Sequence, residues 1–441
     1  MNANVRRIMF AAIVLLTFGI ASQASAQSVV GTCATGTATY TTIQQAVNAS
    51  PSGTVIEICP GNYPEQVTIT KSLTLMGVED PSTGENAAVI VSPAGGVTRT
   101  AFDFDNNSFP IAAQVLVQGT FGIPTQVTLQ DLAVDGAGNA LNGCGTDIAG
   151  ILFQNASGTV QNVATRNQTL IAADAGCQDG EGIFVETQSK YGFSSAVTVQ
   201  NSSVHDYQKN GITGNDLGTS MTITSNSVRG WGATPAIAQN GIQLCCGATG
   251  TITSNSVIDD VYTGPNFGSS GILLFDTLEN GGISVSTNTI GNTQFPVVVF
   301  TDEFAANQYG DGVTILSNQI FGALTFDAID VCTNGNTVKK NTITNSTESA
   351  IHLDASCSGS GNNTGNNNTV IKNVINEGEC AGILSDSGTT NTTPSLNTFN
   401  NVTFQTASST ASCSPAPAAA ASIRSKGTER RPQPMIRRVK K

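Results

Sequence analysis

Charged side chains, tryptophan and methionine are scarce in this chain of 441 residues. Asp, Glu, Lys and Arg make up 11% of the sequence, and there are 5 Met and 1 Trp. A disordered chain would combine high charge with few β-branched residues, but short Val and Ile runs recur throughout. A nucleic-acid-binding protein would present a basic surface, whereas 31 acidic residues outnumber 19 basic ones here. The sequence therefore excludes a disordered chain, and we expect no nucleic-acid partner.

Gly, Asn, Thr and Ser fill the intervals between these Val and Ile runs. The chain contains 46 Gly, which is unfavourable inside helices, and its apolar runs are short and β-branched. The composition therefore excludes a mainly helical protein. A chain of this length fits two or three average domains, or one large all-β or repeat domain.

The charge is unevenly distributed along the chain. Residues 27–414 contain 30 acidic and 9 basic residues, whereas residues 415–441 contain 8 basic residues and one acidic residue. Pro and Ala repeats open the second segment, and pairs of basic residues close it. We therefore predict one folded domain over 27–414 and a disordered basic tail over 415–441.

The first 26 residues have the pattern of a secretory signal peptide. Arg6 and Arg7 precede an apolar run over 8–20, and small residues follow at 24–26. A membrane anchor is the alternative, but the run is shorter than the ~20 residues that span a bilayer. We predict cleavage near Gln27 and a secreted protein, extracellular or periplasmic, with no membrane span. We expect a monomer.

The chain contains 10 Cys, an even number that suits disulfide formation in an exported protein. Cys33 with Cys59 and Cys332 with Cys357 are candidate neighbouring pairs, but spacing leaves the connectivity open. No spacing matches a zinc ribbon or a redox motif, and two of the cysteines are adjacent, so we expect structural disulfides.

Internal repetition is the strongest signal in the sequence. The segments 222–228 and 251–257 are identical, each alternating β-branched and polar residues before an Asn and a Val. Further copies lie about thirty residues apart, within the range of structural repeats. They centre on Asn201, Asn288, Asn318, Asn341 and Asn373, with weaker copies at Asn162 and Asn401.

A second element falls between these copies, in the form of a Gly or Ala followed by Ile and alternating apolar residues. Examples begin at Gly150, Gly182, Gly241 and Gly271. Each period therefore predicts two short strands separated by turns. Such units bury their apolar side chains only by stacking, and a recurring Asn can form an amide ladder at one turn. We predict a parallel β-solenoid of about nine or ten coils rather than a β-propeller, which needs four strands per repeat.

The N-terminal part of the chain resembles a known family. Residues 40–48, the turn over 60–65 and the strand Lys71-Ser72-Leu73-Thr74-Leu75-Met76-Gly77 are similar to the start of pectin methylesterases and of the wider right-handed parallel β-helix superfamily. The resemblance implies an all-β, single-stranded right-handed parallel β-helix whose first coil is capped by a helix with Ile43, Ala46 and Val47 facing inward. The segments that carry the catalytic Asp and Arg of pectin methylesterases are absent from the sequence.

Alternation along the second element predicts which side chains point outward. With its Gly or Ala as position zero, positions +1 and +3 face the core and positions +2 and +4 face out. Asp330, His352 and Asp354 then form a polar patch on two neighbouring coils. A carboxylate beside a His suits acid–base work, but solvated surface and a cation site are the alternatives.

Rare side chains gather in the segments that follow the Asn element. Arg166, His205, Asp206, Tyr207, Arg229, Trp231, Asp259, Asp260 and Tyr262 all lie a few residues after that Asn on four consecutive coils. Aromatic rings stack on sugars, Arg binds a uronate carboxylate, and an acid–base pair transfers a proton. This pattern predicts a groove for an acidic polysaccharide.

Three interpretations of the groove remain open. In a catalytic groove, Arg229 would neutralise the uronate, His205 or Asp206 would act as base, and Asp259 or Asp260 would be the acid or a Ca²⁺ ligand. In a binding groove, Arg166, Tyr207, Trp231 and Tyr262 would hold the sugar without turnover. In the third, these residues merely pack. The leading hypothesis is a protein that acts on or binds pectin-like or alginate-like polysaccharide, and the rival is a non-catalytic surface solenoid.

Overall fold

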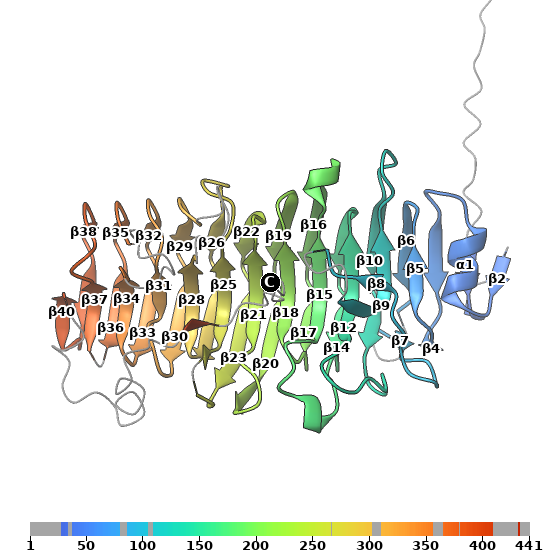
Figure 1. Ribbon diagram of the computed structural model, residues 1–441, viewed down its shortest axis with the longest axis horizontal. Helices are drawn as coiled ribbons and strands as arrows, with labels where there is room; N and C mark the ends of the chain where they lie inside the picture. Colours follow the sequence, from blue (N-terminus) through green and yellow to red (C-terminus); the bar gives the residue numbers. More distant parts are fainter. Residues whose placement is uncertain are drawn as a thin grey trace, which may run out of the picture.

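The computed structural model describes residues 28–33, 38–79, 86–104, 109–265, 267–301, 310–355, 365–378, 380–408 and 431–432. Apart from 431–432, these residues form one elongated solenoid whose coils follow one another from the N-terminal to the C-terminal end (Figure 1). The predicted signal peptide, Cys357 and most of the predicted basic tail lie outside the described residues. No helix in the described part of the chain is long and apolar enough to cross a membrane.

Three long parallel sheets form the walls of the solenoid. Sheet A has fourteen strands: β2 (Ala38–Tyr40), β1 (Ser28–Val30), β3 (Val55–Ile58), β6 (Leu73–Gly77), β10 (Gln126–Gln130), β13 (Ser157–Gln161), β16 (Ser195–Gln200), β19 (Thr219–Thr224), β22 (Thr249–Thr253), β26 (Ser284–Ser286), β29 (Thr314–Leu316), β32 (Thr337–Lys339), β35 (Thr369–Ile371) and β38 (Thr393–Ser395).

Sheet B has twelve strands: β4 (Gly61–Pro64), β7 (Ala88–Val91), β11 (Ala133–Asp135), β14 (Ala164–Arg166), β17 (Ser203–His205), β20 (Ser227–Thr234), β23 (Ser256–Tyr262), β27 (Thr289–Thr293), β30 (Gln319–Ala323), β33 (Thr342–Ser346), β36 (Val374–Gly378) and β39 (Thr398–Asn400).

Sheet C has thirteen strands, of which β8 (Ala101–Phe102) pairs antiparallel with β9. The other twelve are β5 (Val67–Ile69), β9 (Pro110–Gln118), β12 (Asp147–Gln154), β15 (Glu181–Glu186), β18 (Asn210–Asn215), β21 (Asn240–Cys245), β25 (Ser270–Phe275), β28 (Phe295–Phe300), β31 (Ile329–Val331), β34 (Ser349–Leu353), β37 (Ala381–Ser385) and β40 (Phe404–Ala407). Two short strands, β24 (Phe267–Gly268) and β41 (Arg431–Pro432), pair with each other.

The coils contain three strands each, and not the two that the repeat predicts. The third strand follows the Asn element directly and belongs to sheet B, as in β17 and β20. In β17 only Val204 points into the core, so three residues offer no alternation to detect. The sheets, with twelve to fourteen strands each, also show more coils than the predicted nine or ten.

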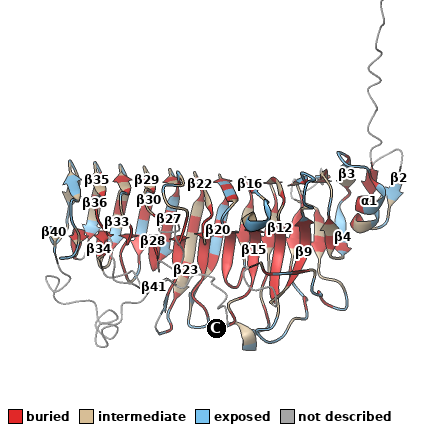
Figure 2. Ribbon diagram, turned by 45° about the horizontal axis from the view of Figure 1, so that its top comes forward, coloured by how far each residue is buried: buried red, intermediate tan, exposed pale blue. Residues whose placement is uncertain are grey.

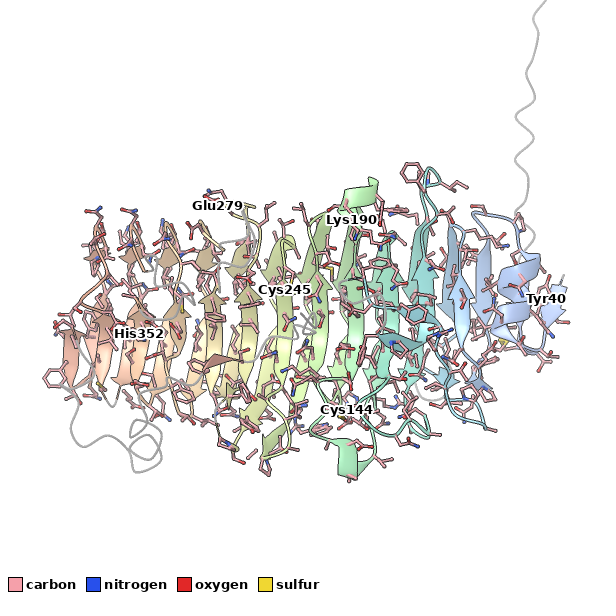
Figure 3. All side chains as sticks on the ribbon, viewed as in Figure 1. Tyr40, Cys144, Lys190, Cys245, Glu279 and His352 are labelled. Atoms are coloured by element: carbon pink, nitrogen blue, oxygen red, sulfur yellow. A yellow bond between two sulfur atoms is a disulfide. The ribbon has the colours of Figure 1, made fainter. Side chains whose placement is uncertain are left out.

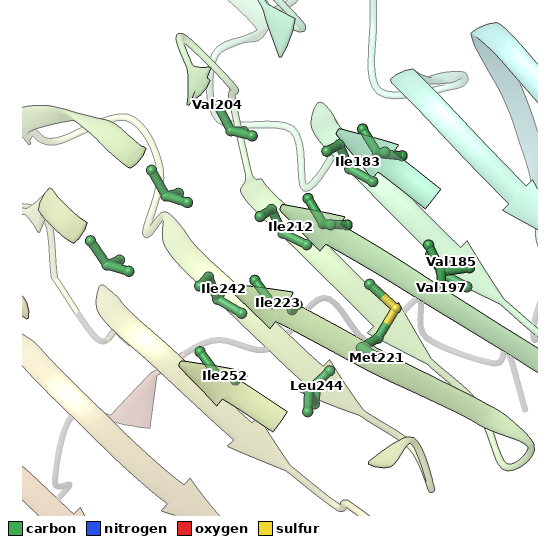
Figure 4. Close-up of a cluster of buried hydrophobic side chains, with 14 of the residues drawn as sticks. Ile183, Val185, Val197, Val204, Ile212, Met221, Ile223, Ile242, Leu244 and Ile252 are labelled. Carbon is green, nitrogen blue, oxygen red and sulfur yellow. The ribbon is translucent and has the colours of Figure 1, made fainter. Parts of the chain in front are cut away.

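The core is a column of stacked apolar side chains between the three sheets. Ile183, Ile212, Ile242 and Ile272 are register partners on four successive strands of sheet C, and all are buried. Figure 4 shows several of them packed against Val and Ile side chains of sheets A and B. These residues occupy position +1 of the Gly-Ile element, so its predicted inward direction is confirmed.

A ladder of Asn side chains runs along the turn between sheets A and B. The Asn255 Oδ1 accepts the Asn226 backbone N–H, and the Asn288 Oδ1 accepts that of Asn255, both at 2.9 Å. The same pattern continues through Asn318, Asn341, Asn373 and Asn397. The predicted ladder is therefore confirmed, but Asn162, Asn201 and Asn401 stand outside it. They have a left-handed backbone with φ of 50°, 51° and 54°, a conformation that Asn tolerates well.

The N-terminal end carries the helix α1 (Ile43–Ala49), whose Ile43, Ala46 and Val47 are buried (Figure 1). Glu65 accepts the backbone N–H groups of Ile43 and Gln44, which satisfies donors that a helix start leaves without partners. A disulfide joins Cys33 to Cys59, as predicted. Others join Cys144 to Cys177 and Cys245 to Cys246.

Candidate functional site

Most of the predicted groove residues lie on adjacent strands of sheet B, whereas Asp206 and Tyr207 directly follow the end of β17. His205 of β17 is the register partner of Arg229 of β20. Their inward neighbours Val204 and Val228 are buried, so His205 and Arg229 point outward. Register partners on parallel strands are separated by about one strand spacing of ~4.8 Å. The fold therefore brings these two side chains together on one surface.

An open cavity of about 580 Å³ lies over these strands. Four predicted site residues line it, namely His205, Asp206, Arg229 and Trp231, and the others in its wall are Ser203, Val204, Ser227 and Gly230. We refer to this cavity as the sheet B cavity.

Arg229 is the most exposed charged group of the sheet B cavity. Its side chain is 66% exposed, and its Nε donates to Asp259 Oδ2 at 2.9 Å. Within the described residues, this contact engages one nitrogen of the guanidinium. A guanidinium has five N–H donors in a planar fork, so Arg229 retains donors for a ligand carboxylate while Asp259 fixes its direction.

A register shift places Trp231 at the rim of the same cavity. The pairing of β20 with β23 shifts between Arg229 and Gly232, and a bulge of this kind redirects the neighbouring side chains. The Trp231 backbone N–H donates to Gln239 Oε1 at 2.8 Å, which holds the irregular segment in place.

His205 and Asp206 form a surface pair at the other side of the sheet B cavity. The His205 Nδ1 lies 2.6 Å from Asp206 Oδ2, and the two side chains are 36% and 53% exposed. Asp206 has a positive φ of 53°, which turns the chain at the end of β17. The pair is accessible to a ligand and offers both hydrogen-bond donors and acceptors.

Arg166 continues the outward row one coil before His205. Its Nε donates to Asp135 Oδ2 at 2.8 Å. Burial alone would raise the pKa of Asp135, but hydrogen bonds from Asn167 and Ala137 and the charge of Arg166 hold it below its ordinary value. Arg166 does not line the sheet B cavity.

Three other predicted site residues lie inside the solenoid. Tyr207 and Asp260 are completely buried, and the Tyr207 hydroxyl donates to Asp260 Oδ1 at 2.6 Å. Tyr262 is 8% exposed, and its hydroxyl donates to the carbonyl of Pro265. A polysaccharide on the surface cannot touch Tyr207 or Asp260, because both side chains are completely buried. We therefore assign neither residue a contact with a ligand.

The structure also buries Lys209, directly before β18, a residue that the sequence pattern does not predict as a site residue. The Lys209 Nζ donates to the carbonyl of Ala238 at 2.5 Å. Burial lowers the pKa of Lys209 to about 7, although the charges of Glu181 and Asp260 act in the opposite direction. Burial is also the main reason that the pKa values of Asp260 and Tyr207 are raised. The one available signal was a Lys directly before a strand expected to be buried.

A second polar centre lies on the outer face of sheet C, near the C-terminal end of the solenoid (Figure 3). The sequence predicts a patch of Asp330, His352 and Asp354, and the structure adds Asp327 and Asp386. The His352 Nδ1 lies 2.9 Å from Asp327 Oδ2, and its Nε2 lies 3.3 Å from Asp386 Oδ1. We refer to these five residues as the His352 centre.

The His352 centre is buried, whereas the sequence suggested an exposed sheet surface. His352 is 5% exposed, and Asp327, Asp330 and Asp354 are also buried. Burial disfavours the charged imidazole, but the charge and hydrogen bond of Asp327 and the hydrogen bond of Asp386 raise the pKa of His352 well above its ordinary value. The imidazolium is therefore the stable form between these two carboxylates.

The carboxylates of the His352 centre could also hold a cation. Ligand atoms of Asp327, Asp330 and His352 lie within 4.8 Å of one another, as do those of His352, Asp354 and Asp386. Carboxylate oxygens suit a hard cation such as Ca²⁺. Both ring nitrogens of His352 already face carboxylates, so the four Asp residues are the better donors. The sheet B cavity has no comparable group of ligands among the described residues.

Comparisons with known proteins support the fold. No family model matches the chain, and no curated protein matches it. Among solved structures, it is similar to the catalytic domain of a GH87 α-1,3-glucanase in complex with tetrasaccharides, with 13% identity over 90% of this chain and 68% of that chain and a TM-score of 0.52. It is also similar to a GH136 lacto-N-biosidase from Eubacterium ramulus, with 11% identity, 87% and 68% coverage and a TM-score of 0.53.

Identities this low show the fold alone. The chain is a right-handed parallel β-helix, as the N-terminal resemblance implied. The same scaffold hosts unrelated functions, so a function must be argued from the site itself.

Proposed function

We propose that this chain is an exported β-helix protein that binds an acidic polysaccharide in the sheet B cavity. The observation that supports this proposal is the gathering of His205, Asp206, Arg229 and Trp231 around one open cavity. The chemistry of these residue types is the basis on which the sequence predicts them as site residues. Merely packed side chains would not need to share an accessible cavity.

Each group around the cavity has a defined task in the proposal. Arg229 donates to a uronate carboxylate while Asp259 holds it in place. Trp231 offers a flat apolar surface to a sugar ring. His205 and Asp206 exchange hydrogen bonds with sugar hydroxyls. The chain is acidic overall, so recognition of an anion depends on Arg229 rather than on general attraction.

Binding fits this geometry better than turnover does. A catalytic groove needs both a base and an acid within reach of the sugar. Asp260 is completely buried and Asp259 is engaged by Arg229, which leaves the His205–Asp206 pair as the accessible acid–base group of the cavity. We therefore propose a binding protein. The experiments below are also designed to detect catalytic turnover of the polysaccharide.

The test is calorimetric titration of the full exported chain with pectate, methylated pectin, alginate and a neutral glucan. We expect binding to the uronate polymers and none to the glucan. Arg229→Ala should weaken uronate binding at least ten-fold, as expected for loss of a charged hydrogen bond. Arg99→Ala is the matched control, because Arg99 packs over the Phe102 ring away from the cavity. Equal binding by wild type and Arg229→Ala would contradict the proposal.

Proton NMR of the same mixtures, with and without Ca²⁺, separates binding from turnover. New alkene signals would indicate a lyase, free methanol an esterase, and altered C5 stereochemistry an epimerase. Unchanged spectra together with calorimetric binding are the expected result. If turnover is seen, the variants Arg229→Ala and His352→Gln will show which of the two polar centres performs it.

A further inference from the structure

The outward row that passes through the sheet B cavity continues towards the C-terminal end of the solenoid. Strands β20, β23, β27 and β30 follow one another along sheet B (Figure 2). On the last three, the register partners in the row of Arg229 are Ile258, Gly291 and Phe321. The residue before each of these four is buried in the central core, so the row itself points outward. It therefore lies on the same side of the molecule as the cavity.

The row ends in an exposed aromatic side chain. Phe321 is 37% exposed, and the buried apolar clusters of the described residues do not include it. A single exposed apolar side chain is common on soluble proteins. What distinguishes Phe321 is the surface on which its ring lies.

The Phe321 ring lies over the backbone of Gly291, on the preceding strand. A Cβ atom on Gly291 would lie 2.5 Å from two atoms of this ring and 2.6 Å from a third. The backbone of Gly291 does not have the positive φ that favours glycine, so the missing side chain matters because it leaves room for the ring. One side of the ring is packed on the sheet, and its exposed part is the side turned away from the sheet.

The position of the ring relates it directly to Arg229. Gly291 lies two strands from Arg229, which corresponds to about 10 Å at the spacing of parallel strands. Ile258 occupies the outward position between them and is half-buried. The surface therefore presents a guanidinium, an aliphatic side chain and an aromatic ring in one line.

A second outward row, of hydrogen-bonding side chains, runs beside the first. Ser227, Ser256, Thr289 and Gln319 are register partners two residues earlier on the same four strands. All four are exposed or half-buried, and neither β27 nor β30 contains a charged residue. Sugar units have the same division, because their ring faces are apolar and their hydroxyl groups lie at the edge. The two rows thus match a sugar chain that lies across the strands.

We propose that Phe321 forms a second sugar-binding subsite, and that a linear acidic polysaccharide extends along sheet B from Arg229 to this ring. The inference rests on the proposed function and extends it, because Phe321 does not line the sheet B cavity. Arg229 binds the carboxylate of one uronate unit, and the Phe321 ring stacks on the apolar face of another unit. A ligand must therefore be long enough to reach both groups before it binds with full affinity.

Calorimetric titration of the full exported chain with uronate oligomers of increasing length tests the second subsite. The readout is the affinity for long oligomers divided by that for the shortest oligomer that binds. Phe321→Ala should lower this ratio about two- to ten-fold, as expected for loss of a stacked ring. Phe404→Ala is the matched control, because Phe404 is 38% exposed but belongs to β40 of sheet C. It should keep the wild-type ratio.

A glycine substitution tests the position of the ring without removing it. In Gly291→Ala the new Cβ displaces the Phe321 ring from the sheet, so the ratio should fall as it does in Phe321→Ala. Gly145→Ala is the control, because a Cβ there meets no atom within 4 Å. Circular dichroism confirms that each variant keeps the solenoid.

The outcomes separate this inference from the proposed function. If Arg229→Ala weakens binding of short oligomers but Phe321→Ala and Phe404→Ala give equal ratios, the second subsite is wrong and the proposed function stands. If no oligomer binds at any length, both are wrong. Concentration-dependent dimerisation that Phe321→Ala abolishes would assign the ring to a contact between two copies, and would also overturn the subsite.

Discussion

The outer faces of sheets B and C carry similar side chains but differ in how far water reaches them. On sheet B, Arg229 and His205 are exposed, and each pairs with a neighbouring carboxylate. On sheet C, His352 is enclosed with four Asp residues, and Glu186 is buried with a raised pKa that burial mainly causes. The same residue types are thus available for a ligand on one face and form internal networks on the other.

The two histidines of the chain make this comparison measurable. Each contacts an Asp through Nδ1, at 2.6 Å for His205 and 2.9 Å for His352. Their side chains are 36% and 7% exposed. Differences between them therefore report exposure together with the second carboxylate, Asp386, that His352 contacts through Nε2.

The largest expected effect is the loss of His352. Replacement by Leu leaves Asp327 and Asp386 without their cation, and breaking a buried pair in this way costs about 3–5 kcal/mol. His205→Leu removes a surface pair and should change the free energy of unfolding by less than ~0.5 kcal/mol. Urea unfolding followed by circular dichroism measures both. Equal midpoints for the two variants would contradict the comparison.

The pH dependence of stability should also separate the two histidines. The folded pKa of His352 is raised above its unfolded value. Its contribution is therefore fully present below the unfolded pKa of ~6.5 and is lost as the pH rises through the folded pKa. In this window wild type should lose up to about 1.4 kcal/mol per pH unit relative to His352→Leu. The measurements should be made in buffer with a chelator, so that no metal ion binds at the His352 centre and alters its stability.

The pH dependence of stability that comes from the buried Lys209 should have the opposite sign to that of His352. Its folded pKa is about 7, below the unfolded value of ~10.4, so the unfolded chain binds more protons between these two values. Relative to Lys209→Met, wild type should therefore gain stability as the pH rises from about 7 to 10. Titration of the Lys209 side chain by NMR gives the pKa directly, and an unshifted value would show that water reaches this interior.

The smallest effect is expected at the ion pair of Arg166 and Asp135. The Arg166 side chain is 33% exposed, and solvent-screened pairs contribute less than about 1 kcal/mol. The lowered pKa of Asp135 means that this contribution is present above the unfolded pKa and is lost as the pH falls through the folded pKa. Thermal unfolding of Asp135→Asn at pH 7 and pH 3 should differ from wild type only at pH 7.

The fold could be predicted from the sequence because each coil repeats the same few local sequence patterns. Inward Ile residues after Gly, and an Asn at one turn, are local patterns that recur with every coil. The third strand of each coil was not predicted, because segments such as Ala164–Arg166 place only one residue inward and so show no alternating pattern. Asn201 was assigned to the ladder because an Asn in a left-handed turn and an Asn in a ladder look alike in sequence.

The candidate sites were less predictable because they depend on contacts between coils. The grouping of His205 and Arg229 could be predicted, because both residues lie a few positions after the repeated Asn of their coils. The burial of Tyr207 could not, since it depends on Asp260, which lies 53 residues away in sequence. Asp327 and Asp386 join His352 from a preceding turn and a following coil, at separations of 25 and 34 residues. No local pattern carries such information.

The most direct test of the account is an NMR titration of the two imidazoles with a uronate oligomer. The signals of His205 and His352 are assigned from the single variants His205→Leu and His352→Leu. The account predicts that the oligomer shifts the signals of His205, which lines the sheet B cavity, and leaves those of His352 unchanged. A shift of the His352 signals alone would contradict it and would place the ligand on sheet C.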